Sequence, residues 1–211
     1  MPTNLNLMWQ ELYNSSGFCN FIHTIHTMKK YFLPSLLSTA FLLSLCFILP
    51  GNEKKKEEKI KWRSFSEAVE LNKKKPKKIF IDVYTDWCGW CKKMDGEAFQ
   101  NEAIAKYINE KYYAVKLNAE MKDTVIFNNF TFVNPNPANP RSVHQLAASL
   151  LNNKMTYPTG VYMDENFGIL QALPGYLDPK TFEMVLKFFG DEANKTTSWE
   201  DFQKSFNGEV K

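Results

Sequence analysis

Apolar residues recur along this 211-residue chain in two patterns, helical spacing and short continuous runs. The first pattern predicts helices that pack through one face, and the second predicts strands buried on both faces. The predicted elements, in chain order, are a helix over about 64–74, a strand over 78–85, a helical stretch ending at about 111, a strand over 112–117, a hairpin over 127–133, a helix over 142–151, strands over 159–163 and 169–173, and a helix from 179 to about 190. This order predicts an α/β domain over 62–190.

Local signals support the helix boundaries. Ser64-Phe-Ser-Glu67 has the capping-box pattern of a helix start, and Asp178 followed by proline is a favourable N-cap and first turn. Pro76 ends the first helix. Gly96 and Asn101 predict a kink or break in the helical stretch that ends near residue 111.

The stretch between the second strand and the next strand pair is longer than a simple connection. We define it as the insert, about residues 119–155. Asn128 and Asn129 are turn residues for its hairpin. Three prolines stiffen the loop that follows the hairpin, at positions 135, 137 and 140. We expect the insert to form a wall beside the domain's functional residues.

The N-terminal region has the layout of an export signal. Residues 32–49 carry no charge, and Lys29 and Lys30 stand just before them. We expect residues 28–51 to be a signal peptide or an N-terminal membrane anchor through residues 31–50. Residues 1–27 are then a leader of doubtful status, because Met28 is an alternative initiator.

Both readings of this region predict export, to the periplasm or to the extracytoplasmic side of a membrane. Lipid attachment at Cys46 is a weaker alternative, since Leu45 is large for the residue before a modified cysteine. A charged linker over 52–61 follows. The polar tail over 191–211 has an apolar stripe, Trp199, Phe202 and Phe206, which predicts a short amphipathic helix docked on its own domain rather than on a partner.

Composition limits the classes of function. Hydrophobic residues make up 44% of the chain, enough for a core, and the formal net charge is only +3. We expect no nucleic acid partner from so small a charge. Much of the lysine lies in 54–78 among glutamates, which is typical of a solvated linker and helix face and less typical of a membrane-surface patch.

Cysteine spacing points to local redox chemistry. Only Cys88 and Cys91 of the four cysteines lie in the predicted domain, at Cys-x-x-Cys spacing. They come directly after a predicted strand and open a helix, whose free N–H groups favour a thiolate. Cys88 is expected to be the exposed attacking sulfur, and Cys91, one helical turn later, can close a disulfide with it.

Structural zinc is the main alternative for such a pair, because Cys-x-x-Cys is half of many zinc sites. The other half would need two more Cys or His residues. The only histidine in the predicted domain is His144, on a predicted helix about fifty residues away, where we expect a surface position. We therefore expect no metal.

Residues 78–93, with Trp-Cys-Gly-Trp-Cys at their centre, resemble the active-site strand and helix of the thioredoxin family. Two later features support the resemblance, which extends over about 62–190. Tyr157-Pro158-Thr159 resembles the family's cis-proline loop, and Gly175 stands near the last helix. Asp86-Trp-Cys-x-x-Cys-Lys, with Phe99 and Asn101 downstream, is also similar to the C-terminal domain of membrane thiol:disulfide interchange reductases and to single-domain exported bacterial relatives.

The resemblance implies a thioredoxin fold, with a central mixed sheet flanked by helices and the insert before the cis-proline loop. It implies catalytic roles for Cys88, Cys91, Asp82 and Pro158. Asp82 is a carboxylate within an apolar strand, which is costly unless it is paired or used, and its implied role is to accept the proton of Cys91. The residues implied to bind substrate are Trp87, Gly89, Trp90 and Tyr157, and those implied to support the site are Lys116 and Thr159.

The function implied is thiol–disulfide exchange, most simply the reduction of disulfides in exported proteins, with no cofactor beyond the cysteine pair. Its partners would be protein disulfides and a membrane thiol electron donor. Gly89-Trp90 replaces the Gly-Pro of ordinary thioredoxins, and this dipeptide influences the redox equilibrium. Alternatives are a disulfide oxidase or isomerase, a peroxidase, and a binding module that uses the insert and the C-terminal helix.

Overall fold

The computed structural model describes residues 57–211. The leader over 1–27, the signal or anchor over 28–51 and Cys46 lie outside the described residues. Across 57–211, no helix combines the length and apolar character needed to cross a membrane.

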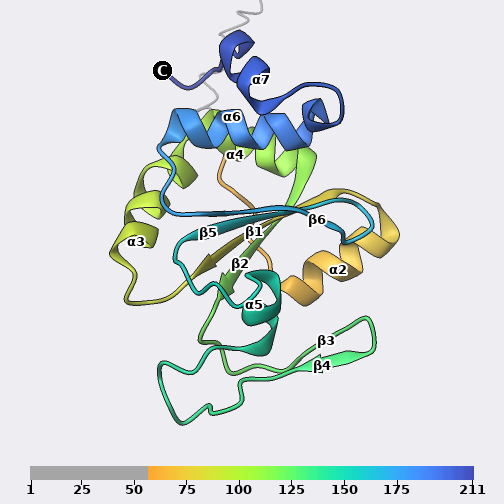
Figure 1. The fold of residues 1–211 in the computed structure, drawn as a ribbon, viewed down its shortest axis with the longest axis vertical. Coiled ribbons are helices and arrows are strands. Elements are labelled where there is room, and N and C mark those ends of the chain that lie inside the picture. The colour runs from red at the N-terminus through yellow and green to blue at the C-terminus, as the bar shows by residue number, and fades with distance from the viewer. Residues whose placement is uncertain (1–56) are drawn as a thin grey trace, which may run out of the picture. The chain divides into compact units, whose positions relative to one another are not determined.

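A four-stranded mixed sheet forms the centre of the domain (Figure 1). Its strand order is β2-β1-β5-β6, with β1 parallel to β2 and the other two pairings antiparallel. Helices cover both faces of this sheet. The architecture is the thioredoxin fold, which confirms the fold expected from the resemblance. The strands are β1 Lys78–Tyr84, β2 Tyr112–Asn118, β5 Thr159–Met163 and β6 Ile169–Pro174.

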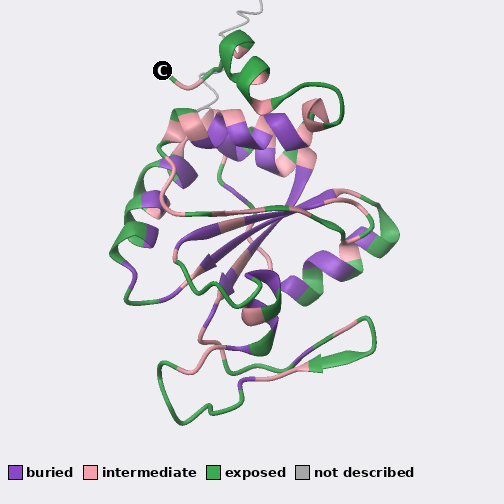
Figure 2. Cartoon of the chain, viewed as in Figure 1, coloured by how far each residue is buried: buried purple, intermediate pink, exposed green. Residues whose placement is uncertain are grey.

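Alternation of side chains along β1 and β2 divides the core into two layers. Ile79, Ile81 and Val83 face one layer, with helices α2 (Phe65–Lys74) and α5 (Gln145–Leu150). Phe80 faces the other layer, with helices α4 (Glu102–Lys111) and α6 (Pro179–Gly190). Figure 2 shows that β1 is buried along its length between these layers. The central strand therefore carries apolar residues on both faces, as its sequence predicted.

The helix after β1 is broken as predicted. It consists of α3 (Gly89–Gly96), the single turn η1 (Ala98–Gln100) and α4 (Glu102–Lys111). The Asn101 side chain accepts the backbone N–H groups of residues 103 and 104 and so starts α4 as a new helix. The last helix of the domain, α6 (Pro179–Gly190), begins at the expected Asp178 cap.

The insert is folded, and its hairpin packs against α2. Its hairpin consists of β3 (Val125–Phe127) and β4 (Phe130–Phe132), and both turn residues, Asn128 and Asn129, have positive φ as turn asparagines often do. Phe127 packs edge-to-face on Phe65 of α2. Helix α5 begins at residue 145, later than the predicted 142, because His144 caps it.

His144 is fully buried, so the expected surface position was wrong. Its Nδ1 accepts the backbone N–H of Leu146, and its Nε2 lies 2.9 Å from the carbonyl oxygen of Asp123. The imidazole thus joins the start of α5 to the loop before β3. Burial lowers the pKa of His144. The helical pattern alone placed His144 at the surface, whereas its ring lies in the core, where burial favours the neutral imidazole.

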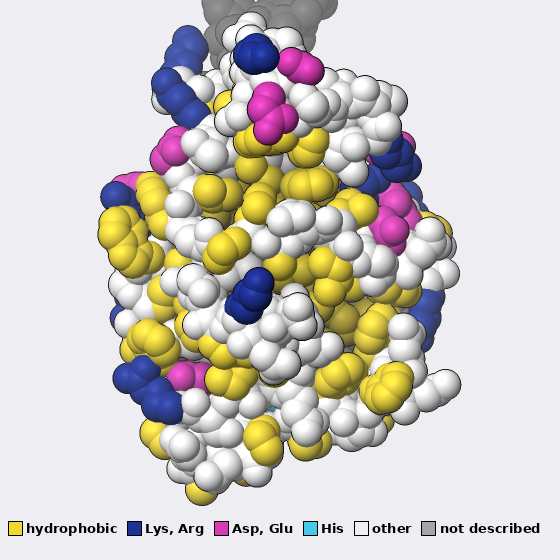
Figure 3. Space-filling model, in the orientation of Figure 1, with side chains coloured by type: hydrophobic (Ala, Val, Ile, Leu, Met, Phe, Trp, Pro, Cys, Tyr) yellow, Lys and Arg dark blue, Asp and Glu magenta, His cyan; other side chains and the backbone are white. Residues whose placement is uncertain are grey.

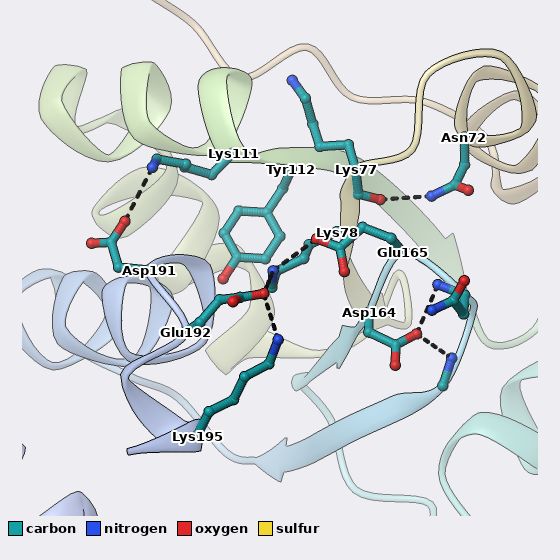
Figure 4. A network of polar contacts seen from close by, with 12 residues as sticks. Asn72, Lys77, Lys78, Lys111, Tyr112, Asp164, Glu165, Asp191, Glu192 and Lys195 are labelled. Atoms are coloured by element: carbon teal, nitrogen blue, oxygen red, sulfur yellow. Dashed lines mark hydrogen bonds and ion pairs between the residues drawn. The ribbon is translucent and has the colours of Figure 1, made fainter. Parts of the chain in front are cut away.

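A polar network closes the end of the sheet where β1 begins (Figure 4). The buried ammonium of Lys78 pairs with Glu165 at 2.8 Å and Glu192 at 3.0 Å, and Glu192 also pairs with Lys195. These contacts join β1 to the β5–β6 turn and to the single turn η2 (Ala193–Lys195) after α6. The network lies at the opposite end of β1 from the cysteines.

The ends of the described chain both dock on the domain. Residues 57–61, expected to belong to the charged linker, are held by Asn109 of α4 through bonds to Glu58, Lys59 and Lys61. At the other end, α7 (Trp199–Ser205) places Trp199 and Phe202 against Phe188 of α6. This docking on its own domain confirms the expectation for the tail.

We predict that His144 makes the folding stability of the domain depend on pH. Its pKa is lower in the folded than in the unfolded chain, so the unfolded state binds more protons as pH falls through about 6.5, and stability falls with it. Asparagine at this position can cap α5 but does not titrate. The stability difference between wild type and His144→Asn should therefore shrink between pH 7.5 and 5.

Denaturant unfolding of both proteins at each pH measures this difference. A difference that stays constant over that range would show that the pKa of His144 is the same in the folded and the unfolded chain, and would contradict the prediction.

Candidate active site

The two cysteines lie where β1 gives way to α3. Cys88 is the N-cap of α3, and its sulfur accepts the backbone N–H of Cys91 at 3.0 Å. The two side chains form a disulfide. The sulfur of Cys88 therefore takes the place of an ordinary capping oxygen at a helix N-terminus, where a negative charge is stabilised.

The exposure predicted for Cys88 is wrong in this disulfide form. Cys88 is 5% exposed and Cys91 is buried. The reason is that the Cys88 sulfur is turned back onto the first turn of α3, toward its partner sulfur and the N–H of residue 91. The neighbouring Trp87 and Trp90 are instead the exposed residues, at 51% and 59%.

The loop before β5 carries the cis-proline implied by the resemblance. The Tyr157–Pro158 peptide bond is cis. The Pro158 carbonyl accepts the N–H of Gly175, and the Thr159 hydroxyl donates to the carbonyl of residue 156 at 2.7 Å. Within residues 57–211, the backbone N–H and C=O of Tyr157 form no hydrogen bond. They are free to pair with an extended peptide.

One wall of the site forms around Trp87. Its indole N–H donates to Glu120 at 2.8 Å, and its ring packs edge-to-face on Tyr157 at 6.0 Å. The guanidinium of Arg141 lies 4.3 Å from the centre of the same ring. Glu120 and Arg141 both belong to the insert, so the insert does stand beside the cis-proline loop.

A second wall forms around Trp90. Its ring lies 5.5 Å from that of Tyr176, in the loop between β6 and α6. The ammonium of Lys93 lies 4.7 Å from the Tyr176 ring centre and 5.2 Å from that of Trp90. The Tyr176 hydroxyl donates to Glu97. Gly89, between the cysteines, is exposed and has open space where a side chain would begin.

Asp82 is buried within β1, with 2% exposure, and Lys116 lies directly opposite it on β2. The Lys116 ammonium donates to Asp82 at 2.6 Å, so the two residues are neighbours as the resemblance implied. Burial raises the pKa of Asp82 to about 6, although Lys116 acts in the opposite direction. The carboxyl thus changes protonation close to neutral pH.

Asp95 completes this cluster and was missed in the sequence. Its carboxylate also pairs with Lys116. The ammonium of Lys116 lies over the rings of Trp62, Tyr84 and Phe99, at 4.9–5.1 Å from their centres. Asp95 stands four residues after Cys91 on a helix, and that spacing, which places it one turn from the cysteine, was the available signal.

Lys116 stays charged in this setting. Burial lowers the pKa of Lys116, but the carboxylates of Asp82 and Asp95 raise it more, with a net rise. In the described part of the chain, no group of side chains has the composition of a metal site. The arrangement combines a cysteine disulfide at a helix N-terminus, a buried acid paired with a lysine, and a cis-proline loop whose backbone at Tyr157 is unpaired among the described residues.

Comparison with known proteins identifies a family. The family model described as "Thioredox_DsbH: Protein of unknown function, DUF255" matches residues 52–168, more than half of the chain. The mouse protein called spermatogenesis-associated protein 20 is 39% identical over 67 residues, and its human counterpart is 37% identical over 67 residues. Those matches cover 32% of this chain but only 8% of either relative.

Solved structures with related folds were also found. A structure called "DsbH Oxidoreductase" is 18% identical, with a TM-score of 0.45, and the match covers 61% of this chain and 83% of that one. A thioredoxin from Thermus thermophilus is 14% identical, with a TM-score of 0.47, and the match covers 62% of this chain and 86% of that one.

We predict that Asp82 costs the folded chain stability at neutral and alkaline pH. The folded carboxyl keeps its proton up to about pH 6, whereas the unfolded one ionises near 3.8, so stability falls as pH rises between these values. The difference corresponds to roughly 3 kcal/mol. Asp82→Asn should therefore be more stable than wild type at pH 8, by up to that amount, and should match it near pH 4.

Denaturant unfolding at the two pH values tests this prediction, with Asp86→Asn as the control, since Asp86 is exposed and has no side-chain partner among the described residues. An Asp82→Asn protein that is less stable than wild type at pH 8 would contradict it.

Proposed function

Because the chain belongs to the family described as Thioredox_DsbH, we propose that it is a thiol–disulfide oxidoreductase that reduces or exchanges disulfides of exported proteins through Cys88 and Cys91. The observation that carries the proposal is the position of the disulfide. It caps a helix N-terminus, between the exposed Trp87 and Trp90. The loop that contacts Trp87 has an unpaired peptide backbone at Tyr157.

In the reduced protein, Cys88 is the nucleophile. The helix N-terminus and the N–H of Cys91 stabilise its thiolate, which attacks one sulfur of a substrate disulfide and releases the other as a thiolate. A mixed disulfide with Cys88 results. A substrate segment bound along Tyr157 would hold the target sulfur close to Cys88. The reason is that the Tyr157 ring packs on that of Trp87, and Trp87 directly precedes Cys88 in the chain.

Cys91 then completes the exchange. Its thiol loses a proton, and its sulfur attacks Cys88, which expels the second substrate thiol and leaves the Cys88–Cys91 disulfide. Two electrons pass from the cysteine pair to the substrate. Asp82 is the proton acceptor in this proposal, since a carboxyl with a pKa of about 6 is largely ionised at pH 7 and still basic enough to take a proton. Lys116 holds it in place.

The proposal includes export and a source of electrons. Export rests on the sequence of residues 28–51, which has the layout of a signal or anchor. An exported compartment favours disulfides, so turnover as a reductase needs a membrane thiol donor to reduce Cys88–Cys91 again. The activity of the larger curated relatives is not carried over, since the chain matches only a small share of their length.

We predict that Cys91→Ser traps substrates. Without the second sulfur, the mixed disulfide on Cys88 cannot be resolved and should accumulate when the reduced protein meets proteins that contain disulfides. Nonreducing gels before and after a thiol reductant detect the adducts. Cys88→Ser, which keeps Cys91 but removes the proposed nucleophile, is the matched control and should trap far less. Equal trapping by both variants, or none by either, would refute the proposed exchange.

The direction of exchange follows from the reduction potential of the pair. We expect a potential near or below about −250 mV, as in reducing thioredoxins. Equilibration of the full chain with thiol buffers, followed by alkylation and mass measurement of the Cys88–Cys91 peptide, gives the value and separates this pair from Cys19 and Cys46. A potential near or above about −180 mV would support an oxidase or isomerase instead.

A further inference from the structure

Basic side chains beside the disulfide are left without acidic partners. Arg141 stacks on Trp87, and Lys93 lies over Trp90 and Tyr176. Among residues 57–211, neither forms an ion pair. On the side where α3 and the loop of the insert lie in Figure 1, Figure 3 shows basic side chains next to hydrophobic ones.

The acids in the same place are mostly engaged by the protein. Glu120 accepts from the indole of Trp87, Glu97 accepts from Tyr176, and Asp95 is paired with Lys116. Asp86, which is exposed and precedes Trp87, has no side-chain partner in the described chain. The positive charges of the two walls are thus available to a bound molecule. Glu120 and Glu97 keep their negative charges, since their donors are neutral, but their carboxylates are held by the protein, and Asp95 is offset by Lys116.

Aromatic stacking also fixes where these charges stand. A cation held over a ring keeps its outward N–H groups free, and the planar guanidinium of Arg141 loses little further freedom when it binds a carboxylate. The rings of Trp87 and Trp90 flank the disulfide in sequence on both sides of Cys88. A peptide whose cysteine lies at the sulfurs would therefore have Arg141 near the residues on one side of that cysteine and Lys93 near those on the other side.

We propose that Arg141 and Lys93 are specificity-determining residues that select peptide segments with acidic residues on either side of the reacting cysteine. This inference rests on the proposed exchange activity and names the class of substrate. Asp86 opposes the selection, because its carboxylate adds a negative charge beside Trp87. Arg141 belongs to the insert, so in this proposal the insert helps to select substrates by their negative charge.

Two matched peptides test the proposal. Each carries one cysteine joined through a disulfide to 2-thiopyridine, flanked on both sides by glutamates in one peptide and by glutamines in the other. The protein used is the reduced full-length chain with Cys19→Ser and Cys46→Ser, so that Cys88 and Cys91 are its only thiols. It attacks the peptide sulfur and releases thiopyridone, which is followed by absorbance, and Cys91 then releases the peptide thiol. The readout is the ratio of the second-order rate constants for the acidic and neutral peptides.

At low ionic strength we expect wild type to favour the acidic peptide by about threefold to tenfold, the size of one or two exposed ion pairs. Arg141→Gln and Lys93→Gln should each lower the ratio, and the double variant should bring it to about one. Arg141→Lys should retain part of the preference. Asp86→Asn should raise the ratio, and added salt should lower it in wild type.

Lys122→Gln and Lys106→Gln are the charge-matched controls, on the insert and on α4, and should leave the ratio unchanged. Wild type with no preference, or a preference that survives in the double variant, would overturn the inference. If the protein releases no thiopyridone from either peptide, the proposed exchange fails instead. In that case the binding affinities are compared for an acidic and a neutral peptide in which serine replaces the cysteine, because binding needs no exchange. Equal affinities would overturn the inference independently.

Discussion

A carboxylate inside a strand that is buried on both faces is the constraint on which this fold and its site depend. Asp82 can occupy the centre of β1 because Lys116 lies directly opposite on the parallel strand β2. A slip of one residue between these strands would move Lys116 to the other face of the sheet and leave a buried charge unpaired. In this arrangement Phe80 and Tyr112 lie in one core layer, and Ile79, Ile81 and Val83 of β1 lie in the other.

The residues around the site come from three separate parts of the chain, and each part reaches it by its own physical means. The end of β1 delivers Cys88 to a helix N-terminus, where backbone N–H groups are unpaired. The cis-proline loop brings Tyr157 against Trp87. The insert contacts Trp87 through Glu120 and Arg141, and within the insert the buried His144 joins the start of α5 to the loop before β3.

Sequence predicted most of this where local signals were strong. The capping box at Ser64, the apolar run of β1 and the break at Asn101 are each determined by residues close in the chain, and each was confirmed. Long-range contacts were beyond such signals. The burial of His144 depends on a carbonyl 21 residues away, and Asp95 joins the site only because Lys116 reaches it from β2. Burial of the Cys88 sulfur also depends on its orientation in the disulfide, which spacing alone does not determine.

Sharing of Lys116 between two acids affects the protonation of the buried carboxyl that the proposed exchange uses. A lysine devoted to Asp82 alone would stabilise its charge and hold the pKa of that carboxyl low, which would make it a poor base. Burial raises the pKa of Asp82, and the negative charge of Asp95, which pairs with the same ammonium, adds to that rise. Because the rings of Trp62, Tyr84 and Phe99 surround the ammonium, it stays between the two acids. In the proposed exchange the helix N-terminus serves the thiolate of Cys88, and this three-residue cluster serves the proton of Cys91, so each sulfur has its own source of activation.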